Sequence, residues 1–133
     1  MNEELRKIAT QNFEIWNDSL QTKEPEKVAA LYSDDATFLP TVLGEFKRGK
    51  TGAKEYFVHF LEKNPSGRIV QDEVQEISQD KYLHCGHYDF EIDNKDEGAT
   101  SPRKTVNARF SYVWKKKEDG SYEILHHHSS LKP

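Results

Sequence analysis

Apolar residues near the N-terminus recur at the spacing of an α-helix. Between Glu3 and Gln21 they return every three or four residues, which places them on one face of an amphipathic helix. These residues are Leu5, Ile8, Ala9, Phe13, Trp16 and Leu20. A second helix is expected to begin at Pro25, because proline has no N–H and suits the first helical turn. Ser33–Asp35 is expected to end this second helix.

A short strand and a third helix are expected in the next segment. The apolar residues Ala36–Leu39 predict a strand that the following proline stops. Residues 41–46 are expected to contain a tight turn at Gly44. The third helix is expected to begin near Gly49 and to close at Asn64–Gly67, because proline and glycine break a helix. Its expected buried side chains are Ala53, Tyr56, Phe57, Phe60 and Leu61.

The second half of the chain changes to a period of two, which is typical of β-strands. The predicted strands are Arg68–Val74, Lys81–Ile92, Thr105–Lys115 and Tyr122–Leu131. In the third of these, large apolar residues alternate with Asn107, Arg109 and Ser111. A hairpin turn is expected at Glu118–Ser121. Helices followed by long antiparallel strands predict an α+β fold with the helices packed on one face of a sheet.

The composition of the chain indicates the size of the core and excludes one class of function. The 133 residues predict one domain, residues 1–133, and 32% of them are charged against 35% hydrophobic. Aromatic residues nevertheless make up 11% of the chain, so large rings can build a small core. The chain has 19 Lys and Arg against 23 Asp and Glu, and this acidic balance argues against a nucleic-acid-binding protein. The short basic run Lys115–Lys117 is interpreted as a solvated hairpin tip.

Features that the sequence lacks exclude further classes of protein. No run of 18 apolar residues is present, so no membrane-spanning helix is expected. The acidic N-terminus lacks an apolar signal core, which predicts a cytoplasmic protein. Cys85 is the single cysteine, so neither a disulfide framework nor a cysteine-rich zinc module is expected. His84 and His87 flank it, but a strand cannot present both on its face, and a buried structural cysteine is favoured.

Three consecutive histidines in the last strand are the first candidate for chemistry. If strict alternation continues from Tyr122 and Ile124, His126 and His128 face the core and His127 faces away. The inward pair could ligate a metal, act as a general acid or base, or form hydrogen bonds within the core. A zinc site needs a third ligand that no spacing supplies, so no metal or cofactor is expected.

A lone arginine and a set of aromatic residues complete the candidates. Arg109 lies in an otherwise uncharged stretch and needs a carboxylate or an anion if it is buried. Its alternation places it opposite the aromatic face, so it reaches a pocket only if the strand has a bulge. The aromatic side chains suit either a pocket wall or a packed core. They are Trp16, Tyr56, Tyr88, Phe90, Tyr112 and Trp114.

Two segments resemble a known family. Residues 24–41, EPEKVAALYSDDATFLPT, resemble the helix-to-strand segment of the SnoaL-like, nuclear-transport-factor-2-like superfamily. Residues 108–133, ARFSYVWKKKEDGSYEILHHHSSLKP, resemble the association (hub) domain of calcium/calmodulin-dependent protein kinase II and its free-standing bacterial relatives of the SgcJ/EcaC type. The resemblance implies a strongly curved antiparallel sheet wrapped around helices like a cone, a conical pocket, and dimers or larger rings formed through the convex face of the sheet.

The chain departs from the hub pattern at the pocket. Kinase hubs carry an arginine where this chain has Tyr112, another where it has Ser129, and a third near Tyr88. Tyrosine and serine therefore largely replace the basic pocket of the hubs, which argues against the binding of acidic ligands in the manner of the hubs. The resemblance also implies that Arg109 and its outward neighbours could face a partner subunit.

Three functions follow as hypotheses. The first is an oligomer of identical subunits whose conical pocket binds a small organic molecule, for example a carboxylic acid. The residues expected to line that pocket are Trp16, Tyr56, Tyr88, Arg109, Tyr112, His126 and His128. The second is an isomerase, cyclase or hydratase in which His126 or His128 carries a proton and Tyr88 or Tyr112 binds an enolate. The third is a structural oligomerisation module with a filled cone, so enzymatic activity remains open.

Overall fold

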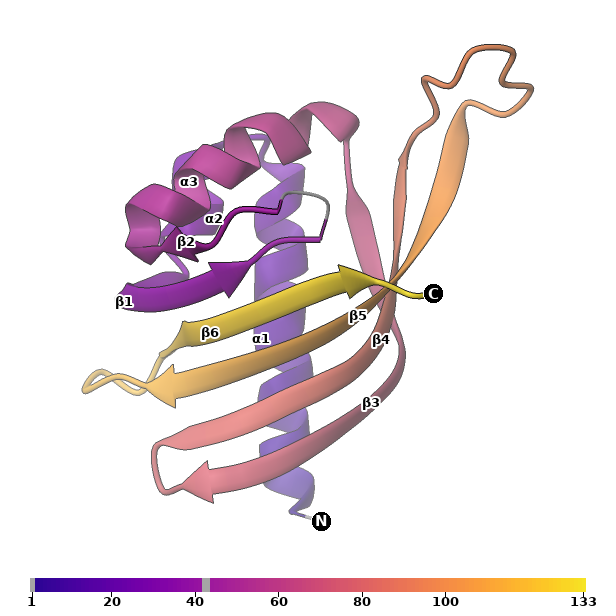
Figure 1. Ribbon diagram of the computed structural model, residues 1–133. Coiled ribbons are helices and arrows are strands. Elements are labelled where there is room, and N and C mark those ends of the chain that lie inside the picture. Colours follow the sequence, from indigo (N-terminus) through magenta and orange to yellow (C-terminus); the bar gives the residue numbers. More distant parts are fainter. Residues whose placement is uncertain (1, 42–43) are drawn as a thin grey trace.

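Helices cover one face of a curved six-stranded sheet in the computed structural model, which describes residues 2–41 and 44–133 (Figure 1). The helices are α1 (Glu3–Gln21), α2 (Pro25–Ala29) and α3 (Gly49–Phe60), and a 3₁₀ turn, η1 (Leu61–Lys63), follows α3. Helix α1 runs across the strands on the inner face of the sheet, while α2 and α3 lie beside its β1 end (Figure 1).

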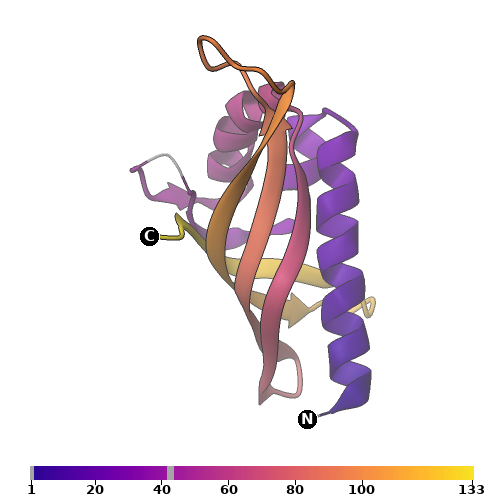
Figure 2. The same cartoon turned by 90° about the vertical axis from the view of Figure 1, so that its right-hand side faces the viewer.

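The sheet is strongly twisted and remains open at its edges (Figure 2). Its strands are β1 (Tyr32–Leu39), β2 (Lys47–Arg48), β3 (Ser66–Ser78), β4 (Lys81–Asp93), β5 (Arg103–Lys116) and β6 (Tyr122–Leu131). Their order across the sheet is β2-β1-β6-β5-β4-β3, and only the β1–β6 pair is parallel. The predicted α+β class and the resemblance-based cone are both confirmed.

The first helix begins and ends where its sequence pattern predicts. The Oδ1 atom of Asn2 accepts hydrogen bonds from the backbone N–H groups of Glu4 (2.9 Å) and Leu5 (3.2 Å), which caps the first turn. Acidic residues in this turn also suit the positive end of the helix dipole. The buried side chains of α1 are Ala9, Asn12, Phe13, Trp16 and Leu20.

The second helix is shorter than predicted. It ends at Ala29, whereas Ser33–Asp35 belongs to β1. The backbone N–H of Ile124 donates to the carbonyl of Leu31 at 2.7 Å, so the chain joins the sheet as soon as α2 ends. The predicted turn over residues 41–46 includes residues 42 and 43, which lie outside the described residues.

The third helix begins at Gly49, as predicted, and the glycine is required there. Gly49 has φ +63°, and a Cβ atom at this position would lie 2.7 Å from the carbonyl oxygen of Asp34. The helix ends in η1, after which Asn64 takes the left-handed conformation and the chain enters β3 at Ser66. The four long strands are confirmed, each with ends within a few residues of the prediction except that β3 continues to Ser78.

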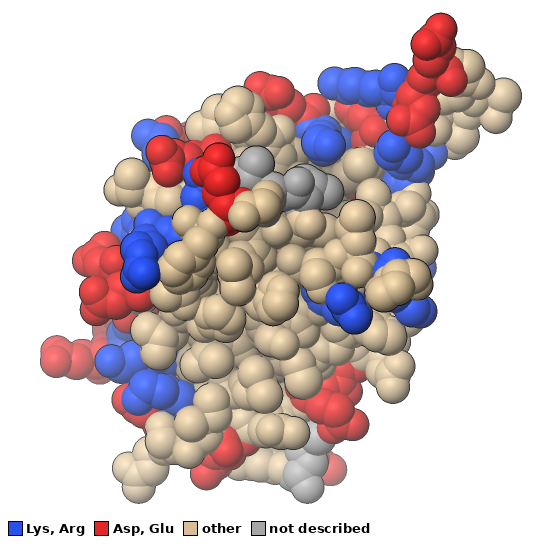
Figure 3. All heavy atoms as spheres, viewed as in Figure 1, with Lys and Arg blue, Asp and Glu red and all other residues tan. Residues whose placement is uncertain are grey.

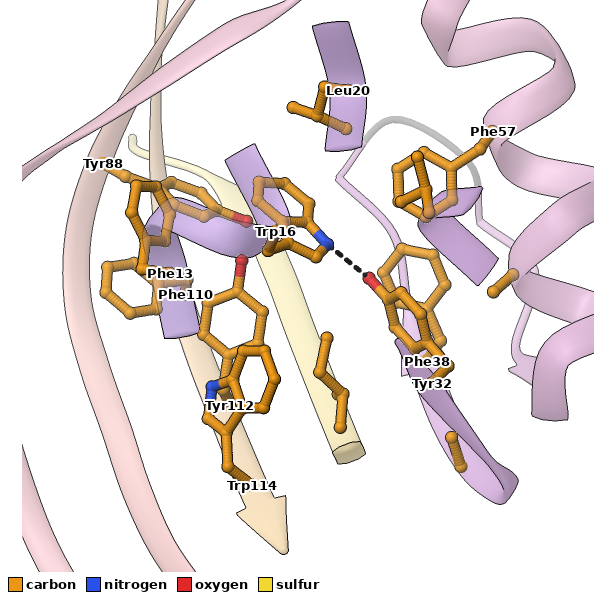
Figure 4. Close-up of a cluster of buried hydrophobic side chains, with 14 of the residues drawn as sticks. Phe13, Trp16, Leu20, Tyr32, Phe38, Phe57, Tyr88, Phe110, Tyr112 and Trp114 are labelled. Carbon is orange, nitrogen blue, oxygen red and sulfur yellow. Dashed lines mark hydrogen bonds between the residues drawn. The ribbon is translucent and has the colours of Figure 1, made fainter. Parts of the chain in front are cut away.

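Aromatic rings fill the space between α1 and the sheet (Figure 4). The indole of Trp16 lies at the centre, with ring centroids of neighbouring aromatics 5.7–6.2 Å away. The inward face of β5 is as predicted, because Ala108, Phe110, Tyr112 and Trp114 are all buried. Among the described residues, no helix is both long and apolar enough to cross a membrane.

Candidate functional site

The histidine that enters the core is His127. Its side chain is only 2% exposed, whereas His126 is half-buried and His128 is exposed. The prediction that His126 and His128 face inward is therefore wrong. Ile124 does face inward, so the alternation must change between Ile124 and His126.

A β-bulge causes this change. In the β5–β6 ladder Trp114 pairs with Ile124, but Val113 pairs with His126, which leaves Leu125 as an extra residue. An extra residue in one strand reverses the facing of every residue beyond it. Beyond the bulge Tyr112 pairs with His127 on the inner face, and their rings stack with centroids 4.1 Å apart. Two adjacent apolar residues, Ile124 and Leu125, are the sequence signal that could have revealed the break in alternation.

His127 is the middle member of a buried chain of hydrogen bonds. Trp16 Nε1 donates to the hydroxyl of Tyr32 at 3.1 Å, a bond that Figure 4 marks, and this hydroxyl lies 2.8 Å from His127 Nδ1. On the other side of the ring, His127 Nε2 lies 3.1 Å from the hydroxyl of Tyr88. Tyr88 in turn donates to Ser129 Oγ at 2.6 Å. A hydrogen bond between Ser129 and Thr41 ends the chain.

The donors in this chain determine the protonation state of His127. Tyr88 donates its only hydrogen to Ser129, so towards His127 its oxygen can only accept, and Nε2 carries the ring hydrogen. On the other side, the hydroxyl of Tyr32 accepts from Trp16 and donates to Nδ1. Nδ1 then carries no hydrogen, and the neutral ring donates from Nε2 to Tyr88. Complete burial, helped by the neighbouring histidines, holds the pKa of His127 well below its usual value, which agrees with a neutral ring.

Among the residues that the structure describes, side chains leave little empty space inside the cone. The cavity at its centre has a volume of about 10 Å³, which is at most room for one water molecule. It lies between the hydroxyl end of the chain, at Ser129 and Thr41, and the rings of Tyr56 and Phe60. The hydroxyl of Tyr112 has no hydrogen-bond partner among the described residues. The side chains named here therefore form a packed core with a polar chain inside it.

The structure separates the seven predicted pocket residues into two groups. Trp16, Tyr56, Tyr88 and Tyr112 are buried inside the cone. Arg109, His126 and His128 lie on the outer face of the sheet, away from α1. His127 and Ser129 take the inward positions on β6. The binding of a ligand by these residues stays a prediction.

The outer face carries a nearly uncharged patch at its centre. Ladder pairing aligns its side chains in rows across three strands: Leu83 with Val113 and His126, and Cys85 with Ser111 and His128. We call this the outer-face patch, and its residues are Leu83, Cys85, His87, Arg109, Ser111, Val113, His126, His128 and Ser130. Arg109 is the only Lys, Arg, Asp or Glu in this set.

Two details of the patch differ from prediction. Arg109 is exposed and its Nε donates to Ser130 Oγ at 3.2 Å, so β5 has no bulge that turns it inward. Cys85 is half-buried rather than buried, and burial raises the pKa of its thiol above the ordinary value. His87 shares its face while His84 does not, as strand alternation requires. The thiol is thus less readily ionised than a free cysteine.

A second buried histidine pairs with a carboxylate on the inner face. His84 Nε2 lies 2.7 Å from Oδ2 of Asp72, and Arg6 of α1 donates to Oδ1 at 2.5 Å. Burial lowers the pKa of His84, so the neutral ring donates from Nε2. Burial raises the pKa of Asp72, but the hydrogen bonds from His84 and Arg6 outweigh it and leave the carboxyl pKa below its ordinary value. Within residues 2–41 and 44–133, no cluster of three metal-ligating side chains occurs.

Comparisons with known proteins show the family to which this chain belongs. The sequence profile of the calcium/calmodulin-dependent protein kinase II association domain matches residues 4–133. A structure from Xanthomonas campestris, named for the same association domain, is 36% identical with a TM-score of 0.86, over 96% of this chain and 87% of that chain. None of the curated proteins matches this chain.

More distant structures share the fold. The association domain of the Caenorhabditis elegans kinase is 18% identical with a TM-score of 0.77, over 97% of both chains. A nuclear-transport-factor-2-like superfamily protein from Salmonella enterica is 17% identical with a TM-score of 0.78, over 98% of this chain and 93% of that chain.

Proposed function

Because the chain belongs to the calcium/calmodulin-dependent protein kinase II association domain family, we propose that it assembles with copies of itself through the outer-face patch. The observation that carries this proposal is the composition of the patch. In a chain with 32% charged residues, the centre of the long-stranded face holds one charge, Arg109. Figure 3 shows this face, with charged side chains mainly towards its edges.

The chemistry of the patch suits contact with an identical surface. Val113 and Leu83 lie side by side and offer apolar area, while Ser111 and the histidines offer groups that can donate or accept hydrogen bonds. A two-fold axis would place each patch against its own copy, so a surface with few charges avoids like-charge contacts. Depletion of charge at the centre of a surface is also the compositional mark of a protein interface.

The filled cone favours a structural role for the interior. A cavity of about 10 Å³ does not admit an organic molecule, which needs roughly 300 Å³ or more. The hypothesis of a ligand inside the cone therefore requires rings such as Tyr56 and Phe60 to move aside. The enzyme hypothesis requires the same movement before His127 could reach a substrate. Of the three hypotheses, a self-association module with a solid core needs no such rearrangement.

A charge placed within the patch tests the proposal. We expect the wild-type protein to have the mass of a dimer or larger oligomer by light scattering at micromolar concentration. Val113→Glu should shift that mass to the monomer, because two carboxylates would be brought together and desolvated. Val58→Glu is the matched control, since Val58 is an exposed valine on α3, away from the sheet face.

Two results would overturn the proposal. One is a wild-type protein that stays monomeric throughout the micromolar range. The other is an oligomer whose mass Val113→Glu leaves unchanged while the circular dichroism spectrum remains that of the wild type. Loss of the oligomer in Val58→Glu alone would instead assign the interface to the helical side.

A further inference from the structure

An open groove lies between α1 and the β5–β6 hairpin, outside the cone's central cavity. Its volume is about 370 Å³, compared with about 10 Å³ for the central cavity. One wall is the face of α1 formed by Ile8, Gln11, Asn12 and Ile15, which recur at helical spacing. We call this the hairpin groove. It does not overlap the outer-face patch, because its strand residues face the inner side of the sheet.

The walls of the hairpin groove are mainly apolar. Ile8, Leu31 and Tyr122 contribute partly buried side chains, and Trp114 contributes a buried indole. Ile15 is 52% exposed, although it belongs to the helix that carries the core. A groove of this volume with apolar walls and a few polar groups is typical of a small-molecule site.

Two lysines and a tryptophan whose N–H has no partner among the described residues also line the hairpin groove. Lys116 and Lys117 line the groove, and none of its lining residues is acidic. Considering only the residues that the structure describes, neither lysine has a carboxylate within 4.0 Å. Trp114 Nε1 is buried and, among the same residues, has no hydrogen-bond partner. An unsatisfied buried N–H is unfavourable, so an acceptor that reached it would be stabilised.

We propose that the hairpin groove binds a small organic anion, a carboxylate attached to an aromatic or alkyl body. The body would pack against Ile8, Ile15 and Tyr122, and the carboxylate would lie near the ammonium groups of Lys116 and Lys117. The chain carries a net charge of −4, so these two lysines offer an anion a local attraction that the whole molecule does not. The proposal is independent of self-association, because it uses a different surface.

The test uses 1-naphthylacetate and its neutral amide as matched probes. In ¹⁵N-labelled protein, we expect 1-naphthylacetate to shift the indole signal of Trp114 saturably and to leave that of Trp16 in place. Trp114→Phe assigns the two indole signals. The amide should bind more weakly, because it lacks the charge that the lysines attract.

Lysine variants separate this site from non-specific attraction. The double variant Lys116→Ala/Lys117→Ala should weaken the binding of 1-naphthylacetate about tenfold and leave that of the amide unchanged, because only the carboxylate is attracted to the two ammonium groups. Lys115→Ala is the control, because Lys115 lies opposite Glu123 in the β5–β6 ladder, on the other face of the sheet, and its loss should change affinity less than about twofold. The proposal fails if neither indole signal shifts, if only Trp16 shifts, or if Lys115→Ala weakens binding as much as the double variant.

Discussion

The side chain of His127 is buried, and both of its ring nitrogens have hydrogen-bond partners. It stacks on Tyr112 and exchanges hydrogen bonds with Tyr32 and Tyr88, so neither ring nitrogen lacks a partner. Burial of an unpaired polar group is unfavourable, and this chain of hydrogen bonds removes that cost. The same chain leaves no acceptor for a second proton on the ring. Protonation of His127 must therefore break at least one buried bond.

Acid should destabilise the protein through His127. Below pH 6.5 the unfolded chain binds a proton at this residue that the folded chain does not, so the free energy of unfolding falls as the pH falls. The expected slope is about 1.4 kcal/mol per pH unit for each such histidine. His127→Gln should reduce the slope between pH 6.5 and pH 5 by about that amount, as measured by urea unfolding at several pH values.

His59→Gln provides the control for this measurement. His59 is exposed on α3, so His59→Gln makes the same change of side chain without touching the buried hydrogen bonds of His127. His84 and His126 also have lowered pKa values and add to the wild-type slope, which is why the difference between variants is the informative quantity. An identical slope in wild type and His127→Gln would contradict a neutral buried ring.

Asp72 should contribute more to stability than Asp89, a carboxylate of similar exposure. Its carboxylate accepts from Arg6 and His84, so Asp72→Asn weakens one charged bond and introduces an amide beside the buried ring. We expect a loss of about 2 kcal/mol in the free energy of unfolding at pH 7. Asp89 is equally covered, at 13% exposure against 12%, but pairs with the exposed Arg68 on the outer side.

Asp89→Asn is therefore the matched comparison and should cost less than about 1 kcal/mol. Equal losses in the two variants, measured by urea unfolding at pH 7, would show that the contact with His84 adds nothing.

At the scale of the elements, irregularities in the strands decide which residues meet. The bulge at Leu125 turns His127 inward, and a second shift in β3, between Ile69 and Gln71, lies opposite the region of Gly86. Bulges increase the local twist of a sheet. Both bulges belong to strands of the curved sheet (Figure 2), and the added twist favours this curvature.

Gly86 should tolerate no side chain. Its φ is +156°, and a Cβ atom would lie 1.9 Å from the carbonyl oxygen of Gln71 in the neighbouring strand. Since backbone would have to move, Gly86→Ala should lower the free energy of unfolding by about 2 kcal/mol or more. Gly44→Ala, where a Cβ atom meets nothing within 4 Å, should change it by less than about 0.5 kcal/mol. Similar thermal midpoints for the two variants would contradict this account.

At the scale of the whole molecule, the two faces of the sheet have different roles. The inner face is occupied by aromatic rings, and it leaves a central cavity of about 10 Å³. The outer-face patch has little charge: of its nine residues, Arg109 alone is Lys, Arg, Asp or Glu. A small domain with a polar sequence gains stability when such a face is covered by a second copy, because association favours the folded state.

Stability should therefore depend on protein concentration. If folding is linked to assembly through the outer-face patch, a tenfold increase in concentration should raise the thermal midpoint by about 2–4 °C. Val113→Glu should remove this dependence and Val58→Glu should retain it. Calorimetry over a hundredfold range of concentration measures the effect, and a constant midpoint for the wild type would contradict linked assembly.

Local patterns determined most of the fold. Helical spacing predicted the extent of α1, and alternation predicted the inward rings of β5, because each pattern depends on neighbours within one element. The end of α2 was predicted wrongly, since the residues that favour a helix stop, Ser33–Asp35, already belong to β1, which pairs with β6 from Tyr32 onwards. A hydrogen bond to a distant strand can override such a local preference.

The candidate site depended on tertiary structure to a greater extent. The sequence by itself determined that the last strands carry histidines and tyrosines and that the first helix carries a tryptophan on its apolar face. Only the tertiary structure decided that His127, and not His126 or His128, enters the core. The physical reason is the extra residue at Leu125: alternation has a period of two, so a single unpaired residue exchanges the two faces of the strand.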